Sequence, residues 1–336
     1  MLNYFIFPFL LITSSSLCIF IDPIWAIAPF IWVLIIVPII DYFLSNLNKP
    51  ENKLNEHHLH NFALIIILPG IFFLIFFGLI KVSQSEITFL QAAAIGAAVG
   101  MSGGSIGITT AHELIHRNSK KMRGIGVLLL VLCLYGHFRI EHIYGHHKNF
   151  ATKQDPATAR KNENFYFYLI RCVIMSLISS WKIEKKILIN KNLSCYSIRN
   201  RIFHYFFMEL LLLILCFSIA ELKGLIFFLI HSAISIILLE LVDYIQHYGL
   251  ERSKKEGKYE IYGEQHSWNS RHASANWSTF NLGLHSEHHI TASKHYPLLS
   301  QQQKIMEMPA NYPLMIMMAL LPPIWFKVMN AKLMNK

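Results

Sequence analysis

The sequence predicts an all-α membrane protein with six transmembrane helices and a histidine-rich cytoplasmic cap. Its 336 residues are 54% hydrophobic and only 15% charged, with a mean hydropathy of +0.39. A soluble domain has about 25% charged residues, so this composition indicates a membrane protein. Six apolar stretches are close to or above the roughly 20 residues that a helix needs to cross a bilayer. We therefore expect spans at residues 4–21, 24–44, 61–81, 88–111, 203–221 and 224–246.

The individual spans carry further signals. No basic residue precedes the first span and no A-x-A site follows it, so we do not expect it to be a signal peptide. Gly96, Gly100 and Gly104 in the fourth span form a small-xxx-small face that is typical of close helix packing. Three shorter apolar runs are expected to form helices on or dipping into the membrane surface, at residues 125–137, 165–180 and 313–329.

The distribution of Lys and Arg predicts the orientation. The loop between the fourth and fifth spans carries 16, the segment after the sixth carries 10, and the loop between the second and third carries 2. The opposite side carries only Lys81 and Lys223. By the positive-inside rule, both termini are expected to be cytoplasmic. We expect one membrane-embedded catalytic domain, residues 1–336, with cytoplasmic catalytic segments at 112–202 and 247–336. The five cysteines contain no CxxC pair, so neither disulfides nor a thiolate site is expected.

Histidines gather in four segments at the expected cytoplasmic ends of the spans. The segments are HELIH, EHIYGHH, DYIQHYGL and LGLHSEHH. Spacings of three and four place imidazoles on one helical face, where two can bind one ion. The fourth and sixth spans both run inward, so all nine histidines can meet at one level and bind metal. These candidate ligands are His112, His116, His142, His146, His147, His247, His285, His288 and His289.

The pattern leaves the metal open. HELIH matches the HExxH motif of zinc peptidases, but such a site needs three protein ligands and a water, which leaves most of the histidines unexplained. Nine ligands exceed one ion, so two ions are expected. Imidazole suits Fe, Zn, Cu or Ni, and oxygen activation by iron would fit a hydrocarbon substrate in the bilayer. Nearby carboxylates are expected to offset the positive charge of the two ions and to accept hydrogen bonds from the ligand histidines. The candidate carboxylates are Glu113, Glu141, Asp155, Glu240, Asp243 and Glu287.

The remaining histidines are expected to have roles other than metal binding. The NEHHLH segment, His57, His58 and His60, is expected to be solvated in a loop. Hydrogen bonding to the ligands is expected for His137, His266 and His272, and packing roles for His204, His231 and His295.

From the second span onward, the sequence resembles the integral-membrane alkane monooxygenases, or alkane hydroxylases, of the histidine-rich membrane di-iron oxygenases and desaturases. The resemblance is carried by HELIHR (112–117), YGHFRIEHIYGHH (135–147) with DPAT (155–158), DYIQHYGLER (243–252), HSWNSRH (266–272) and LGLHSEHH, which ends at residue 289. The corresponding family patterns are HELxHK, EHxxGHH, NYxEHYGL and QRHSDHH, and the HYG motif separates this group from the acyl-lipid desaturases. The chain departs from these patterns at Arg117, Asp243, Gln246, Leu284 and Glu287.

The resemblance implies a desaturase-like fold in which the nine histidines named above bind two iron ions. It also implies O₂-dependent terminal hydroxylation of medium- or long-chain n-alkanes to primary alcohols. Electrons would come from NADH through rubredoxin reductase and rubredoxin, at a bacterial inner membrane. The basic cytoplasmic face is compatible with an acidic rubredoxin.

Alternatives remain open at this level. Gln246 also occurs in methyl-arene (xylene) monooxygenases, and an acyl-lipid desaturase or hydroxylase is possible on the same scaffold. A metal transporter is disfavoured, because carriers place ionisable residues at mid-membrane depth whereas Asp41, Glu209, Glu240 and Asp243 lie toward span ends. On the second span, Trp32 and Val33 are candidates for setting the usable chain length.

Overall fold

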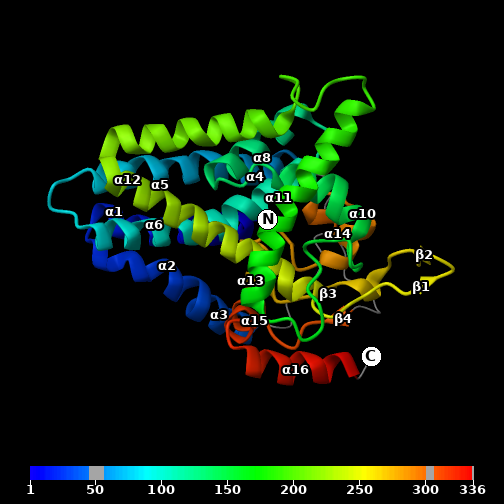
Figure 1. The fold of residues 1–336 in the computed structure, drawn as a ribbon. Helices are drawn as coiled ribbons and strands as arrows, with labels where there is room; N and C mark the ends of the chain where they lie inside the picture. The colour runs from blue at the N-terminus through cyan, green and yellow to red at the C-terminus, as the bar shows by residue number, and fades with distance from the viewer. Residues whose placement is uncertain (45–56, 300–305, 335–336) are drawn as a thin grey trace.

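The structure, a computed structural model, describes residues 1–44, 57–299 and 306–334. Its described residues are almost entirely helical (Figure 1). The α-helices are α1 (Asn3–Phe20), α2 (Ala28–Ile31), α3 (Val37–Leu44), α4 (His57–Ile65), α5 (Ile67–Val82), α6 (Phe89–Ser102), α7 (Thr109–Ile115), α8 (Lys120–Leu132), α9 (Phe138–Glu141), α10 (His147–Asn149), α11 (Phe165–Ile189), α12 (Arg201–His247), α13 (Ala273–Ser278), α14 (His285–Ile290), α15 (Tyr312–Ala319) and α16 (Pro322–Met334).

Shorter elements join these helices. The 3₁₀ turns are η1 (Pro23–Ile27), η6 (Glu264–His266) and η7 (Tyr296–Leu298), and the π-helical segments are η2 (Trp32–Ile36), η4 (Gly103–Ile108) and η5 (His142–His146). The strands have two residues each: β1 (Lys254–Lys255) pairs antiparallel with β2 (Lys258–Tyr259), and β3 (Trp268–Asn269) pairs parallel with β4 (Met306–Glu307).

Helix starts follow from local sequence. Thr88 and Gln91 form a capping box in which the Thr88 hydroxyl accepts from the Gln91 N–H at 3.2 Å and the Gln91 carboxamide accepts from the Thr88 N–H at 2.9 Å. Asn164 and Asn200 cap α11 and α12 with their side-chain oxygens. These caps satisfy amide groups that a helix leaves unpaired at its N-terminus.

Six helical stretches in the described residues are long and apolar enough to cross a membrane: Asn3–Phe20, Pro23–Leu44, His58–Val82, Phe89–Ile115, Phe165–Ile189 and Arg201–His247. The chain is therefore a multi-pass membrane protein. The α12 stretch contains two expected spans, because non-helical backbone at Ala220 and Glu221 turns it back on itself, as Figure 1 shows. With α12 counted as two helices, the expected six spans are all helical.

Two surface expectations had different outcomes. The run at 165–180 belongs to α11, which extends to Ile189 and is long enough to cross a membrane, but Figure 1 shows it running across the direction of the bundle helices. The run at 125–137 dips into the bundle: the Leu132 carbonyl at the end of α8 lies 3.1 Å from the His231 ring Nε2 on α12.

The glycine face packs α6 and η4 against α12. A Cβ at Gly96 would lie 2.3 Å from the Phe227 carbonyl oxygen, and one at Gly100 would lie 2.7 Å from the His231 carbonyl oxygen. At Gly104, a Cβ would lie 2.8 Å from Leu238 Cβ. Only residues without a side chain allow this approach, so the small-residue face predicted from sequence is confirmed as a packing surface.

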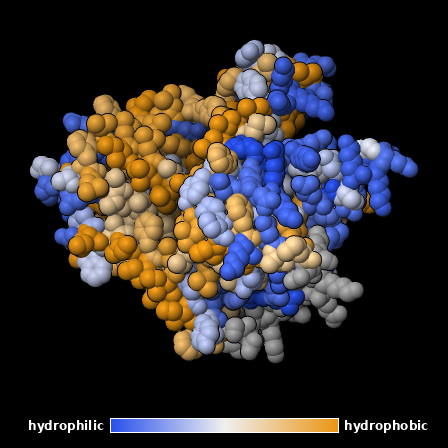
Figure 2. Space-filling model, turned by 60° about the horizontal axis from the view of Figure 1, so that its bottom comes forward, coloured by the Kyte–Doolittle hydropathy of each residue, from blue (hydrophilic) through white to orange (hydrophobic). Residues whose placement is uncertain are grey.

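The molecule has an apolar and a polar end. Figure 2 shows hydrophobic side chains over the helical bundle and hydrophilic ones gathered at the opposite end. Both terminal helices reach the polar end: Tyr4 donates to the Asn281 side chain at 3.0 Å, and Trp325 packs against Tyr248. Lys223 lies at the other end, where it donates to the Gln84 carbonyl. Four lysines that entered the charge count lie outside the described residues: Lys49, Lys53, Lys304 and Lys336.

Candidate metal centre

The nine candidate histidines meet at the polar end of the bundle in two groups. Within each group, one ring nitrogen from every residue lies within 4.8 Å of those of the others. The five-histidine group contains His112, His116, His142, His147 and His288, and the four-histidine group contains His146, His247, His285 and His289. Seven of the nine side chains are buried, and His116 and His147 are partly exposed. The structure therefore brings together all nine residues that the sequence singled out.

The partition differs from what simple helical spacing suggests. His142 and His146 are four apart, yet His142 shares its group with His147, whose Nε2 lies 3.0 Å from the His142 Nε2. The reason is the π-helical turn η5, which holds more residues per turn than an α-helix and therefore aligns residues five apart. His146 and His147 are adjacent in the sequence but therefore belong to different groups. His285 and His289, on the α-helix α14, keep the spacing of four within one group.

Close nitrogen pairs define each group. In the five-histidine group, the Nε2 atoms of His116 and His142 lie 3.1 Å apart. In the four-histidine group, the Nε2 of His285 lies 3.1 Å from that of His247 and 2.9 Å from that of His289. About 3 Å is the spacing of adjacent donors around an ion bound at roughly 2.1 Å. The arrangement is that of ligands around a metal.

Several of these nitrogens have no hydrogen-bond partner among the described residues although they are buried. They include Nε2 of His112, His146 and His288. Buried polar atoms without partners are rare in folded proteins and mark places where an ion or water is bound. Because the donors are all imidazole nitrogens, this set suits a first-row transition metal. Both groups therefore fit a metal ion on the evidence of their own atoms.

The protonation of the rings is consistent with metal binding. Burial, followed by the charge of His146, lowers the pKa of His116 to about 3. Burial, followed by the charges of neighbouring imidazoles, holds the pKa values of His142, His147, His288 and His289 well below the ordinary value. These rings are neutral at physiological pH, and a neutral imidazole has the lone pair that a metal needs.

His146 is held by a carboxylate. Its Nδ1 lies 3.0 Å from Asp155 Oδ2, which also accepts from the Thr158 hydroxyl at 2.6 Å. Burial alone would lower the pKa of His146, but Asp155, with smaller effects of Asp243 and Glu141, raises it to about 9. The hydrogen bond to Asp155 occupies Nδ1, so a metal would bind at Nε2 and displace the proton that this nitrogen carries below that pKa.

The remaining candidate carboxylates are placed differently. Glu113 lies 2.7 Å from the Arg117 guanidinium and accepts from the Tyr296 N–H at 3.1 Å. Glu240 accepts from the Tyr135 hydroxyl at 2.7 Å. Glu287 forms an ion pair with Lys294. Burial, followed by the charge of Asp155, raises the pKa of Glu141 to about 8.

Of the other histidines, His60 corrects the sequence interpretation. It was expected to be solvated, but it is 3% exposed and its Nδ1 lies 3.0 Å from the Tyr296 hydroxyl, because α4 packs against the segment after α14. His58 is exposed as expected, and the side chain of His57 lies outside what the structure describes. His272 bonds to the Ser270 hydroxyl at 3.0 Å, and His266 lies 3.3 Å from Glu260.

Sequence reasoning missed one residue beside the site. The Phe150 ring stacks on His289 with their centroids 3.9 Å apart, and the guanidinium carbon of Arg252 lies 5.7 Å from the centroid of the Phe150 ring. Its position directly after the EHIYGHHKN segment was the available signal. Phe150 therefore covers one face of a ring of the four-histidine group.

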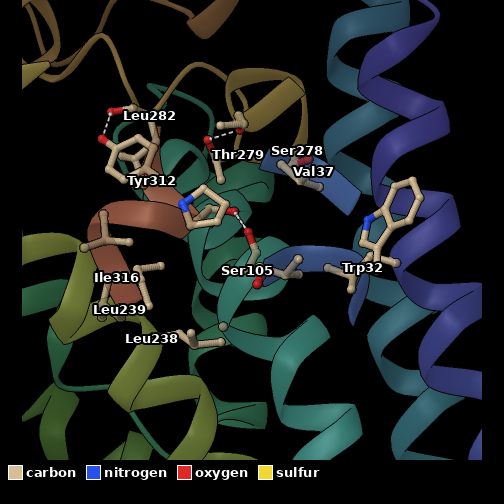
Figure 3. Close-up of a pocket in the computed structure, with 17 residues that line it drawn as sticks. Trp32, Val37, Ser105, Leu238, Leu239, Ser278, Thr279, Leu282, Tyr312 and Ile316 are labelled. Atoms are coloured by element: carbon tan, nitrogen blue, oxygen red, sulfur yellow. Dashed lines mark hydrogen bonds between the residues drawn. The ribbon is translucent and has the colours of Figure 1, made fainter. Parts of the chain in front are cut away.

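A narrow apolar cavity of about 60 Å³ lies inside the bundle, near the histidines. Figure 3 shows Trp32 on one side of it and Leu282 with Tyr312 on the other. Thr109 and Leu282 line it, and each lies three residues before a clustered histidine, His112 and His285. Trp32 and Val33, singled out from the sequence, both line this cavity.

Comparison with known proteins agrees with this architecture. The model of the fatty acid desaturase family matches residues 87–318. Alkane 1-monooxygenase 2 of Alcanivorax borkumensis is 35% identical over 70% of this chain, and alkane 1-monooxygenase 2 of Pseudomonas aeruginosa is 37% identical over 70%. The chain spans 62% of the length of each of these two relatives. Alkane 1-monooxygenase of Acinetobacter baylyi is 33% identical over 89% of this chain and 74% of the relative. The chain therefore belongs to the fatty acid desaturase family and is a relative of the alkane 1-monooxygenases.

Proposed function

We propose that this protein is a membrane hydroxylase that uses O₂ to convert the terminal carbon of medium- or long-chain n-alkanes to a primary alcohol. The nine histidines would hold two irons, one in each group, within a single membrane-embedded domain. The observation that carries the proposal is the apolar cavity lined by Thr109 and Leu282, each of which lies three residues before a clustered histidine, His112 and His285. The names of the alkane 1-monooxygenase relatives support the same reaction class.

The cavity suits a hydrocarbon. Its lining residues are mostly aliphatic or aromatic, and they come from the spans and from the α13–α15 region. About 0.8 kcal/mol per CH₂ favours transfer of an alkane from water into such surroundings. The hydroxyl of Thr109 faces its own helix, donating to the Ser105 carbonyl at 2.8 Å, so it does not present a free polar group to the substrate.

Attack on a terminal carbon needs geometric control, because primary C–H bonds are stronger than secondary ones. A narrow cavity provides that control if only the chain end can reach the histidine groups. Gln246, next to His247, donates to the Tyr312 hydroxyl at 2.6 Å, and Tyr312 lines the cavity. This hydrogen bond connects the cavity wall to α12, the helix that carries His247. The end of an alkane in the cavity would thereby be aligned with the histidine groups.

The protein's own groups prepare the site for metal. Iron bound there would supply the redox chemistry that O₂ activation requires. The neutral imidazoles provide lone pairs, and Asp155 fixes the ring orientation of His146 through its Nδ1. Phe150, stacked on His289, limits water access to the four-histidine group from the surface.

We also propose that the polar end and both termini face the cytoplasm of a bacterial inner membrane. Electrons would come from NADH through a reductase and rubredoxin docking at that end. The concentration of Lys and Arg in the segments 112–202 and 247–336 supports both statements.

The test is product analysis in cells that lack other alkane oxidation. The protein is expressed with a rubredoxin and its reductase, n-alkanes of several lengths are supplied, and products are identified by gas chromatography. We expect primary alcohols from wild type and from His58→Ala, whose side chain is exposed, and none from His146→Ala. Benzylic alcohols only, alkenes only, or iron uptake without O₂ consumption would refute the proposal.

A further inference from the structure

A hollow beside the five-histidine group is lined by three arginines, Arg117, Arg123 and Arg139, together with His116. Among the described residues that line it, none is an aspartate or glutamate. The other polar lining groups are Asn118 and the hydroxyls of Tyr144, Thr291 and Ser293, which can donate hydrogen bonds. The hollow therefore combines a strong positive charge with several donors.

Arg117 is the strongest indication of a missing acceptor. Its side chain is 5% exposed, and its Nη2 lies 2.7 Å from Glu113 Oε1. Its Nε and Nη1 are buried with no hydrogen-bond partner among the described residues. Because an unsatisfied buried donor is costly, particularly on a charged group, these two nitrogens favour binding of an acceptor from outside the chain.

Arg139 repeats the pattern from another element. Its Nη1 donates to the Tyr205 hydroxyl at 3.0 Å, while its Nε is buried without a partner in the part of the chain that the structure describes. Arg123 holds the loop in place by donating to the carbonyls of Arg117 at 2.8 Å and Asn118 at 2.7 Å. Two arginines thus have unused donors, and the third fixes the loop that carries one of them.

The neighbouring imidazoles do not neutralise this charge. The rings of the five-histidine group contact other histidines and aromatic rings, and among the described residues no carboxylate is hydrogen-bonded to them. The four-histidine group, in contrast, has Asp155 on His146.

We propose that this hollow binds a phosphate-type oxyanion, either the headgroup of an anionic phospholipid or free phosphate. Guanidinium forks match phosphate oxygens, and hydroxyls complete such sites. The hollow lies at Ile115, where the span Phe89–Ile115 ends, which is the depth of lipid headgroups. The inference goes beyond the alkane hydroxylase proposal and does not depend on it.

The experiment measures binding rather than activity. The full chain with its metal is placed in nanodiscs of phosphatidylcholine, and inorganic phosphate is titrated by calorimetry. We expect saturable binding of one phosphate per chain. Arg139→Gln, which leaves the contact between Arg117 and Glu113 in place, should weaken it about tenfold, because a charge-assisted hydrogen bond is lost. The matched control is Arg199→Gln, an exposed arginine outside the hollow, which should bind as wild type does.

Native mass spectrometry distinguishes the two sources. If the protein retains phosphatidylglycerol, and if both added phosphate and Arg139→Gln reduce that retention, the ligand is a lipid headgroup. Phosphate binding without a preference for phosphatidylglycerol would identify the free anion, and both outcomes support the proposal. The proposal is overturned if neither phosphate nor phosphatidylglycerol binds, or if only an acidic peptide binds. It is also overturned if Arg199→Gln weakens binding as much as Arg139→Gln does, or if phosphate binding depends on the metal and not on Arg139.

Discussion

The Oδ2 atom of Asp155 lies 3.0 Å from Nδ1 of His146, and both side chains are fully buried. The same carboxylate accepts from the Thr158 hydroxyl and from the Ala157 N–H, so its orientation is fixed by its own loop. DPAT, a segment between two histidine clusters, therefore acts on the site through one ring nitrogen. Such outer hydrogen bonds set the tautomer of a ligand histidine and increase its basicity.

Replacing Asp155 by Asn should weaken metal binding by about 10- to 100-fold, because the amide carries no charge to support His146. Metal affinity is measured by competition with a chromophoric chelator, using inductively coupled plasma spectrometry for stoichiometry. Glu251→Gln, which removes an exposed carboxylate, is the control and should bind as wild type does. Unchanged affinity in Asp155→Asn would show that the hydrogen bond has no role in metal binding.

The two histidine groups should lose metal separately. His116→Ala removes a ligand of the five-histidine group, and His285→Ala removes one of the four-histidine group. We expect each variant to fall from two ions per chain toward one, and the double variant to fall toward none. Metal content per folded chain checks this, with the exposed His58→Ala as control. A wild-type content of one ion or fewer would contradict the assignment of one ion to each group.

Trp32 should limit the length of the alkane, because its side chain lines the cavity on the side away from Leu282 and Tyr312 (Figure 3). In Trp32→Ala we expect the product range to extend to longer chains. One methylene in an apolar pocket is worth about 1–3 kcal/mol, so the rate on the first excluded length should rise at least about tenfold. Trp25→Ala, which alters a half-exposed tryptophan outside the cavity, should leave the range unchanged.

The packing of α6 on α12 should depend on the absence of a side chain at Gly96. A Cβ there would lie 2.3 Å from the Phe227 carbonyl, so Gly96→Ala should destabilise the fold by about 1–3 kcal/mol. Gly124→Ala is the matched control, since nothing lies within 4 Å of its Cβ, and it should be neutral or stabilising by about 0.5–1 kcal/mol. Thermal unfolding in detergent measures both, and equal effects would argue against the close contact.

The sequence by itself determined the class of fold and the candidate members of the metal centre. Long apolar stretches need no tertiary information to be recognised, because the bilayer imposes their length. The small residues of the fourth span and the nine clustered histidines were likewise visible as local patterns, and the structure places the glycines against α12 and the histidines at one end.

Only the tertiary structure decided which histidine joins which group. Sequence spacing favoured pairing His142 with His146, but the π-helical turn pairs it with His147. Likewise, His60 was expected in water and is buried against Tyr296, more than two hundred residues away. Whether a side chain is exposed, lines a cavity or lacks a hydrogen-bond partner depends on such distant neighbours. Local patterns determine which residues can bind, whereas the packing of remote segments determines where each ring points.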